Sequence, residues 1–146
     1  MDKNANSSRR QRLTGPPLLE TGRGRSGRRP RPLRGACRPR EGSFSTVSAI
    51  TLAELKFGIE NGEFRAENRR ALIDVLQLFQ TDDLPSGAAE DFGEIKTALV
   101  RKGKAIGPYD MLIAAHSRHI GATVVTNNEP EFRRVPGLSV QNWLKP

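Results

Sequence analysis

Three polar side chains of this protein are of the kinds that bind hard metal ions, and each stands beside an apolar run. Asp110 is the fourth residue of Gly107-Pro108-Tyr109-Asp110-Met111-Leu112-Ile113-Ala114-Ala115-His116. Proline at the first position of a helix and an acid in its first turn are both favoured, so we predict that Asp110 opens a helix. Glu54 stands in a second apolar run, and Asn128 follows the strand-like Ala122-Thr123-Val124-Val125-Thr126.

Alternating strands and helices are expected to position these three side chains. Apolar periodicity, turn residues and capping residues divide the chain after residue 42 into segments. The predicted strands are 45–50 and 123–126, and 138–143 is a last short strand or an extended tail. The predicted helices are 51–60, 67–80, 86–101 (with Ser86 as N-cap) and 108–120, and 130–136 is a loop or short turn. This alternation predicts an α/β fold with a mostly parallel sheet and helices on its faces.

The order of these elements indicates that the three side chains converge. In an open parallel sheet, active groups collect beyond the carboxyl ends of the strands. Glu54 follows one strand, Asn128 follows another, and Asp110 opens the helix that leads into the second strand. Carboxylate and amide oxygens suit Mg²⁺ or Mn²⁺. Such an ion can lower the pKa of a bound water and stabilise charge on a phosphodiester, which is the chemistry of a metal-dependent nuclease.

Positive charge is concentrated at the start of the chain. Residues 1–42 carry 12 Lys and Arg against 3 Asp and Glu, a net charge of +9, whereas the remaining residues carry 12 against 13, a net charge of −1. The first segment is rich in Arg, Gly and Pro and holds no aromatic residue, so we predict that most of residues 1–42 are disordered. An Arg- and Gly-rich segment of this kind can bind RNA through phosphate contacts; the alternative is a solvated segment without a selected role.

The sequence also bears on the location of the protein. No apolar run has the length of a signal peptide core or of a membrane span, so we expect a protein that is neither secreted nor membrane-bound. The single Cys37 excludes an internal disulfide and is in keeping with a reducing cytoplasm. Two His and one Cys give no zinc-ligand spacing.

Residues 43–146 resemble the PIN-domain ribonucleases, and most closely the VapC-type toxins of bacterial toxin–antitoxin pairs. The resemblance covers nearly all of the chain after residue 42, and its runs follow the order typical of the family. These runs are Ser48-Ala49-Ile50-Thr51-Leu52-Ala53-Glu54-Leu55, Phe92-Gly93-Glu94-Ile95, Ile106 to His116, Val124-Val125-Thr126-Asn127-Asn128 with Glu131-Phe132, and Val140-Gln141-Asn142-Trp143-Leu144.

The resemblance implies a PIN-like α/β/α sandwich and an endoribonuclease that depends on Mg²⁺ or Mn²⁺. It further implies a homodimer, an RNA substrate and a cognate antitoxin that blocks the cleft. By this likeness Glu54 and Asp110 are metal-site carboxylates with catalytic roles, and Asn128 stands where the family has Asp or Asn.

One part of the family pattern is missing from this chain. The family opens with an apolar strand that ends in Leu-Asp-Thr-Asn, whose Asp is a central metal ligand, and the nearest run here is Leu18-Leu19-Glu20-Thr21. We therefore expect the first strand to be missing or replaced, with Glu20 as the one candidate substitute for the Asp. We hypothesise that the residues before about 41 come from a shifted reading frame or a wrong start, which translation of the upstream frames of the gene would test. The predicted consequence is weak or absent nuclease activity.

Each candidate residue also has a structural interpretation. Thr51 and Glu54 have the spacing of a capping box, in which Glu54 would bind a backbone N–H. Asp110 is also suited to be a partner of the helix dipole, worth roughly 0.3–1 kcal/mol. Asn128 suits a turn. Thr126 either orients a metal-bound water or ends a strand.

Other polar and aromatic residues are expected to lie outside the site. We predict that Glu94 is a solvated charge, that His116 and His119 lie on a helix surface, and that Trp143 is a core or edge anchor. The alternative function to a nuclease is a remnant without catalysis that binds an antitoxin through its helices or binds RNA through residues 1–42.

Overall fold

The computed structural model describes residues 13–14 and 45–143. A parallel sheet and its connecting helices account for most of these residues. In chain order the elements are β1 (Leu13–Thr14), β2 (Ser45–Ser48), α1 (Ala49–Asn61), α2 (Arg65–Leu76), β3 (Gln80–Asp82), α3 (Ala88–Arg101), α4 (Pro108–His119), β4 (Thr123–Val125), α5 (Glu129–Phe132) and β5 (Ser139–Gln141). The predicted α/β class with a mostly parallel sheet is confirmed.

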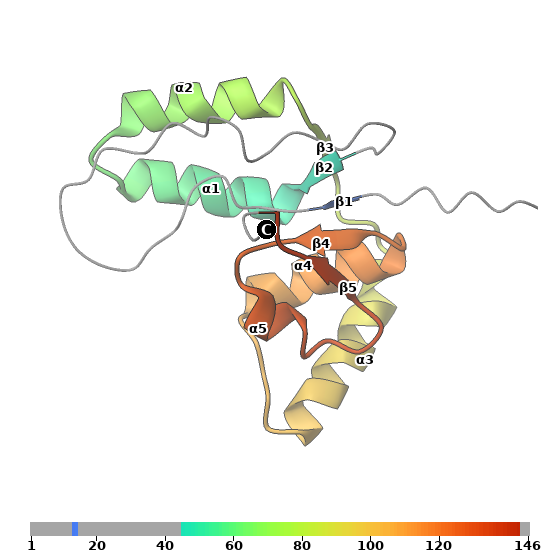
Figure 1. The fold of residues 1–146 in the computed structure, drawn as a ribbon. Coiled ribbons are helices and arrows are strands. Elements are labelled where there is room, and N and C mark those ends of the chain that lie inside the picture. The colour runs from blue at the N-terminus through green and yellow to red at the C-terminus, as the bar shows by residue number, and fades with distance from the viewer. Residues whose placement is uncertain (1–12, 15–44, 144–146) are drawn as a thin grey trace, which may run out of the picture.

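The described strands form one sheet in the order β3-β2-β1-β4-β5, and every pair in it is parallel. The chain therefore leaves the centre towards β3, crosses back over the sheet to β4 and ends at β5. Right-handed connections that run in opposite directions lie on opposite faces of a sheet. In Figure 1, α1 and α2 lie together as one pair, with α2 above the strands and α1 beside β2, whereas α3, α4 and α5 lie below β4.

At the centre of the sheet lies β1, of which the structure describes Leu13 and Thr14. Leu13 pairs with Ser45 on one side and Thr123 on the other, and Thr14 pairs with Thr46 and Val124. The first strand is therefore replaced by a short one, five residues before the run that the sequence offered as its nearest equivalent. That run, with Glu20, lies outside the described residues.

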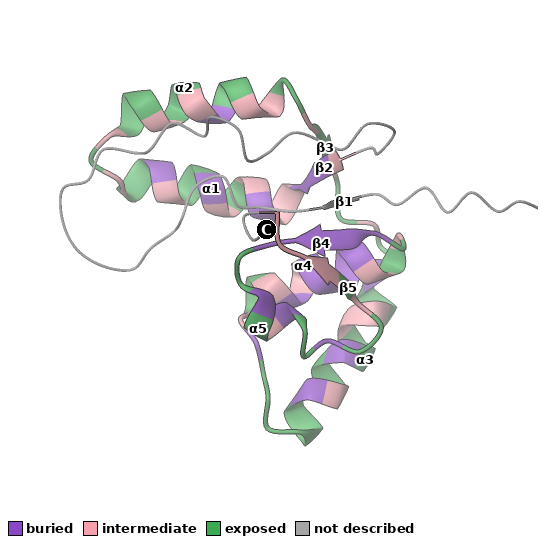
Figure 2. Ribbon diagram, in the orientation of Figure 1, coloured by how far each residue is buried: buried purple, intermediate pink, exposed green. Residues whose placement is uncertain are grey.

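Two clusters of buried apolar side chains hold the helices in place. The larger joins α3, α4, α5 and β4, and its fully buried members include Ile95, Leu99, Ala114 and Val124. The smaller joins α1 and α2 through Leu55, Ile59 and Leu72. Figure 2 shows the result: β4 is buried along its length, whereas α2 is exposed over much of its surface.

Several local predictions need correction. Residues 80–82 form an edge strand where we predicted the end of a helix, because Gln80-Thr81-Asp82 has no apolar residue to mark a strand. Helix α3 has Gly87 rather than Ser86 as its N-cap. Helix α4 is followed by Gly121, which adopts a φ of 66°, in the left-handed region that glycine enters without strain. Among the described residues, none of the helices has the length and apolarity needed to cross a membrane.

Candidate active site

The first turn of α4 holds Asp110 at the edge of the sheet where the strands end. Pro108 stands at the start of the helix, and the Gly107 carbonyl accepts a hydrogen bond from Met111 N at 2.9 Å. The helix is then anchored by its buried face, which includes Met111 and Ile113. Asp110 is thereby fixed at the rim of the core, half-buried, as the sequence predicted.

Asn128 is brought directly against Asp110. Its Nδ2 donates a hydrogen bond to Asp110 Oδ2 at 3.3 Å. The backbone of Asn128 is held in turn, because its N–H donates to Thr126 Oγ1 at 3.0 Å. Thr126 therefore positions the loop that carries the amide, and Asn128 is the residue before α5. The side chain of Asn128 is exposed, so it remains accessible from solvent.

The pKa of Asp110 shows that this corner is crowded with carboxylates. Burial raises this pKa most, and a hydrogen bond with the Glu131 side chain, the charge of Glu131 and the charge of Glu54 raise it further. The hydrogen bond from Asn128 lowers the pKa, and the net result is a value of about 7. A carboxylate surrounded by other carboxylates is the electrostatic setting that a cation relieves.

Glu54 contributes to this corner from α1. It lies two turns into the helix, which begins after the N-cap Ser48, and burial raises the pKa of its half-buried carboxyl group. Its capping-box interpretation is wrong, because the Ser48 side chain caps α1 by accepting from Ile50 N at 3.2 Å. Thr51 lies inside the helix rather than before it.

Glu131 is a site residue that sequence reasoning missed. It lies on the short helix α5, in a segment that we predicted to be a loop or short turn. The signal available in the sequence was the run Glu131-Phe132: the apolar Phe132 is buried to 1% exposure and fixes the turn that presents the acid.

Replacing Glu131 with Gln is expected to lower the pKa of Asp110 from about 7 towards its ordinary value of 3.8, because it removes one of the charges that raise this pKa. Carboxyl ¹³C chemical shifts followed by NMR from pH 3 to 9 would measure the change. The same substitution at Glu90, an exposed acid on α3, is the control and should leave the Asp110 titration unmoved. An unchanged pKa in Glu131→Gln would show that Glu131 does not act on Asp110.

The side chains at this corner offer the kind of ligand atom that a hard cation prefers, but few of them lie close together. Asp110, Glu54, Glu131 and Asn128 offer only oxygen ligands, as Mg²⁺ and Mn²⁺ prefer. Within residues 13–14 and 45–143, however, no three His, Cys, Asp or Glu side chains gather closely enough to hold a metal ion. The carboxylate expected after the first strand would have to come from outside the described residues.

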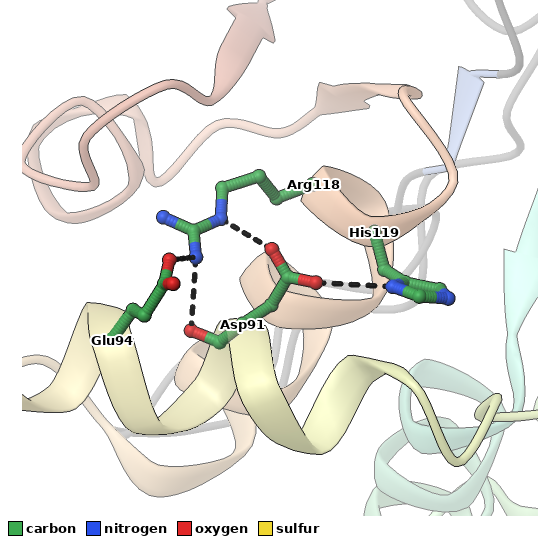
Figure 3. A network of polar contacts seen from close by, with 4 residues as sticks. All are labelled: Asp91, Glu94, Arg118 and His119. Carbon is green, nitrogen blue, oxygen red and sulfur yellow. Dashed lines mark hydrogen bonds and ion pairs between the residues drawn. The ribbon is translucent and has the colours of Figure 1, made fainter.

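A separate polar network fixes α4 against α3, at the end of α4 away from Asp110. Arg118 Nε donates to Asp91 Oδ1 at 2.6 Å, its Nη2 donates to Glu94 Oε2 at 2.5 Å, and His119 Nδ1 lies 3.1 Å from Asp91 Oδ2 (Figure 3). A Cβ on Gly87 would lie 2.4 Å from His119 Cε1, so any larger residue at the start of α3 would require the His119 ring to move. Glu94 is exposed, as predicted, but it pairs with Arg118.

Comparisons with known proteins agree with this geometry. The sequence matches the PIN-domain family over residues 29–138, a match that begins before the predicted boundary at residue 43. It is 38% identical to ribonuclease VapC2 of Rickettsia felis over 99 residues, 68% of this chain and 74% of that protein. It is 36% identical to the tRNA(fMet)-specific endonuclease VapC of Shigella flexneri over 66% of this chain and 74% of that protein.

A solved structure shares the fold. The crystal structure of VapBC2 from Rickettsia felis, bound to a DNA fragment from its promoter, superposes with a TM-score of 0.68 at 36% identity and covers 70% of this chain and 77% of that one. The similarities in sequence and structure agree with the parallel sheet and with the carboxylates at its edge, and together they assign the chain to a family. The chain belongs to the PIN-domain family and, within it, to the VapC ribonucleases of toxin–antitoxin systems.

Proposed function

We propose that this protein is the toxin of a toxin–antitoxin pair and cleaves RNA internally with the help of Mg²⁺ or Mn²⁺. The observation that carries the proposal is the cluster at Asp110, where a half-buried carboxyl group feels the charges of Glu54 and Glu131 and contacts Asn128. Mutual repulsion among these groups favours a divalent cation between them.

The side chains have distinct tasks in this proposal. Glu54 and Asp110 hold the metal ion, and Asn128 either completes its ligands or orients Asp110 through the observed hydrogen bond. Thr126 keeps Asn128 in reach of Asp110. When bound, the ion supplies an acidified water and stabilises charge on the scissile phosphate. Glu131 adds negative charge that strengthens the attraction for the cation.

We expect the activity of this chain to be weak. The family's first-strand Asp is lacking, and the described residues hold no tight group of three metal-binding side chains. This favours a second candidate function, in which the protein binds its antitoxin but cleaves nothing. Titration with Mn²⁺ separates the two, since a nuclease site must bind the ion.

The nuclease proposal predicts slow RNA cleavage that requires Mg²⁺ or Mn²⁺ and falls to background in Glu54→Gln. Because relatives are named tRNA(fMet)-specific endonucleases, initiator tRNA is the first substrate to test, with gel analysis of end-labelled RNA and calorimetric Mn²⁺ titration. Glu90→Gln, an exposed acid on α3 outside both the cluster and the Arg118 network, is the matched control and should behave like the wild type. Cleavage that survives both EDTA and Glu54→Gln would refute the metal-dependent mechanism.

An antitoxin partner and a homodimer are also part of the proposal. Large apolar side chains are exposed on and just after the helices α1 and α2: Phe57 is 72% exposed, Ile73 53% and Leu78 62%. Exposed apolar groups of this size favour a protein partner. Solved relatives include VapBC complexes, in keeping with a cognate antitoxin on this protein. Light scattering of the protein alone and with its antitoxin would test both assemblies.

A further inference from the structure

His116 lies in the interior, which corrects the expectation that it lies on a helix surface. Its side chain is 1% exposed, on the buried face of α4. Its ring Nδ1 lies 3.3 Å from Ser48 Oγ, although the two residues are 68 positions apart in the sequence. Ser48 is equally buried, at 1% exposure. A polar contact between two such buried side chains is directional, so it fixes orientation as well as distance.

Ser48 is the point from which α1 starts. Its hydroxyl oxygen accepts from Ile50 N at 3.2 Å, which caps the helix. A serine hydroxyl can donate one hydrogen bond and accept two, so the same oxygen can also bond to the imidazole. One side chain therefore caps α1 and contacts α4, and α1 and α4 themselves lie against each other.

The surroundings of the imidazole add to this constraint. Asp82 of β3 lies opposite Ser48 in the β2–β3 register, and its Oδ2 is buried without a hydrogen-bond partner among the described residues. The pKa of His116 is lowered, mainly because the side chain is buried. The charge of His119 lowers this pKa further, whereas the charge of Asp82 raises it. A shift of α4 would leave Ser48 and the imidazole buried and unsatisfied, which is costly.

We propose that the His116–Ser48 contact is a positioning device that sets the separation between Glu54 and Asp110. The inference rests on the proposed function. Glu54 lies on α1, six residues after Ser48, and Asp110 lies on α4, six residues before His116. Each interval spans roughly 9 Å of a rigid helix, at a rise of about 1.5 Å per residue. This polar contact joins the start of α1 to α4 and therefore determines how the two carboxylates face each other.

Spin labels can measure this separation without any reference to activity. Cysteines placed at the exposed Lys56 of α1 and Val100 of α3, in a Cys37→Ser background, report how α1 lies relative to the α3–α4 pair by double electron–electron resonance. We expect a narrow distance distribution in the parent and a shifted or broadened one in His116→Leu. His116→Asn, which keeps a polar atom near the position of Nδ1, should restore the narrow distribution.

Two further variants separate positioning from general destabilisation. Ser48→Gly removes the hydroxyl but keeps an acceptable N-cap, so it should change the distance distribution as His116→Leu does. It replaces His116→Leu in the experiment if that variant does not fold. Leu99→Ala removes buried volume from α3 without touching the contact and should lower the melting temperature while the distribution stays narrow. An unchanged distribution in both His116→Leu and Ser48→Gly would overturn the proposal.

Calorimetric titration with Mn²⁺ supplies the functional readout. We expect His116→Leu to weaken Mn²⁺ binding by about tenfold, a loss typical of residues that orient metal ligands, with recovery in His116→Asn. If the parent protein fails to bind Mn²⁺ but His116→Leu alters the distance between the spin labels, the proposed nuclease function is refuted. The role of the His116–Ser48 contact in positioning the helices is then still supported.

Discussion

Asp110→Asn is expected to make the folded protein more stable while it removes metal binding and cleavage. Burial and the two neighbouring glutamates raise the pKa of Asp110 to about 7, which means that its ionised form is disfavoured in the folded state. A shift of this size in a fully buried group corresponds to about 4 kcal/mol. Because Asp110 is only half-buried, solvent screening reduces the expected gain in the free energy of unfolding to about 1–2 kcal/mol.

The sign of the pH dependence follows from the direction of this shift. Between pH 3.8 and about 7 the folded protein holds a proton on Asp110 that the unfolded chain has lost. The contribution of Asp110 to stability is therefore fully present below pH 3.8 and is lost as the pH rises through 7. The advantage of Asp110→Asn should accordingly be small at pH 4 and largest at pH 8.

Urea unfolding at several pH values, with and without Mn²⁺, would measure both effects. Mn²⁺ at ten times its dissociation constant should stabilise the wild type by about 1.4 kcal/mol and should leave Asp110→Asn unchanged. The control is Asp74→Asn, at an exposed position on α2, which should respond to Mn²⁺ as the wild type does. Equal stability of Asp110→Asn and wild type at pH 8 would contradict the crowding of carboxylates at this corner.

Arg118→Met is expected to lower the free energy of unfolding by about 2–4 kcal/mol. The Arg118 side chain is 19% exposed and contacts the Asp91 carboxylate, the Asp91 carbonyl and Glu94 (Figure 3). Its loss leaves Asp91, also 19% exposed, with the imidazole of His119 as its remaining side-chain partner among the described residues. Since α3 and α4 meet at this network, the substitution loosens the helix that carries Asp110.

The acid sensitivity of the wild type provides a second measurement for this network. Burial alone would raise the pKa of Asp91, but hydrogen bonds and charges from Arg118 and His119 outweigh it and lower this pKa. The stabilisation is therefore present above pH 3.8 and is lost as the pH falls below that value, so Arg118→Met should show a flatter decline in acid. Arg69→Met breaks the exposed pair with Glu60 and should cost no more than about 0.5 kcal/mol. A loss for Arg118→Met no larger than that of Arg69→Met would contradict a structural role.

The features of the fold that the sequence predicted are those marked by apolar periodicity. Helices α3 and α4 lie within about two residues of their predicted bounds, because Ile95 and Leu99 fall on one face and Gly121 ends α4. The strand β3 was missed because an edge strand with exposed polar residues has no periodic signal. The strand β1 was missed because a two-residue segment gains its structure from its neighbours on both sides.

The candidate site was predictable where a residue type coincided with an element boundary. Asp110 and Asn128 follow from the start of α4 and the end of β4, and the structure places them in contact. Glu131 could not be found this way, because its role depends on how α5 folds back towards α4. The burial of His116 was equally hidden, since histidine is compatible with both a helix surface and an interior.

The two-residue length of β1 has a consequence for how the molecule comes apart. Among the described residues the middle strand joins β2 and β4 through four paired positions, and each side has its own apolar cluster. We therefore expect the native state to open first at the seam between the two sides, which also divides Glu54 from Asp110.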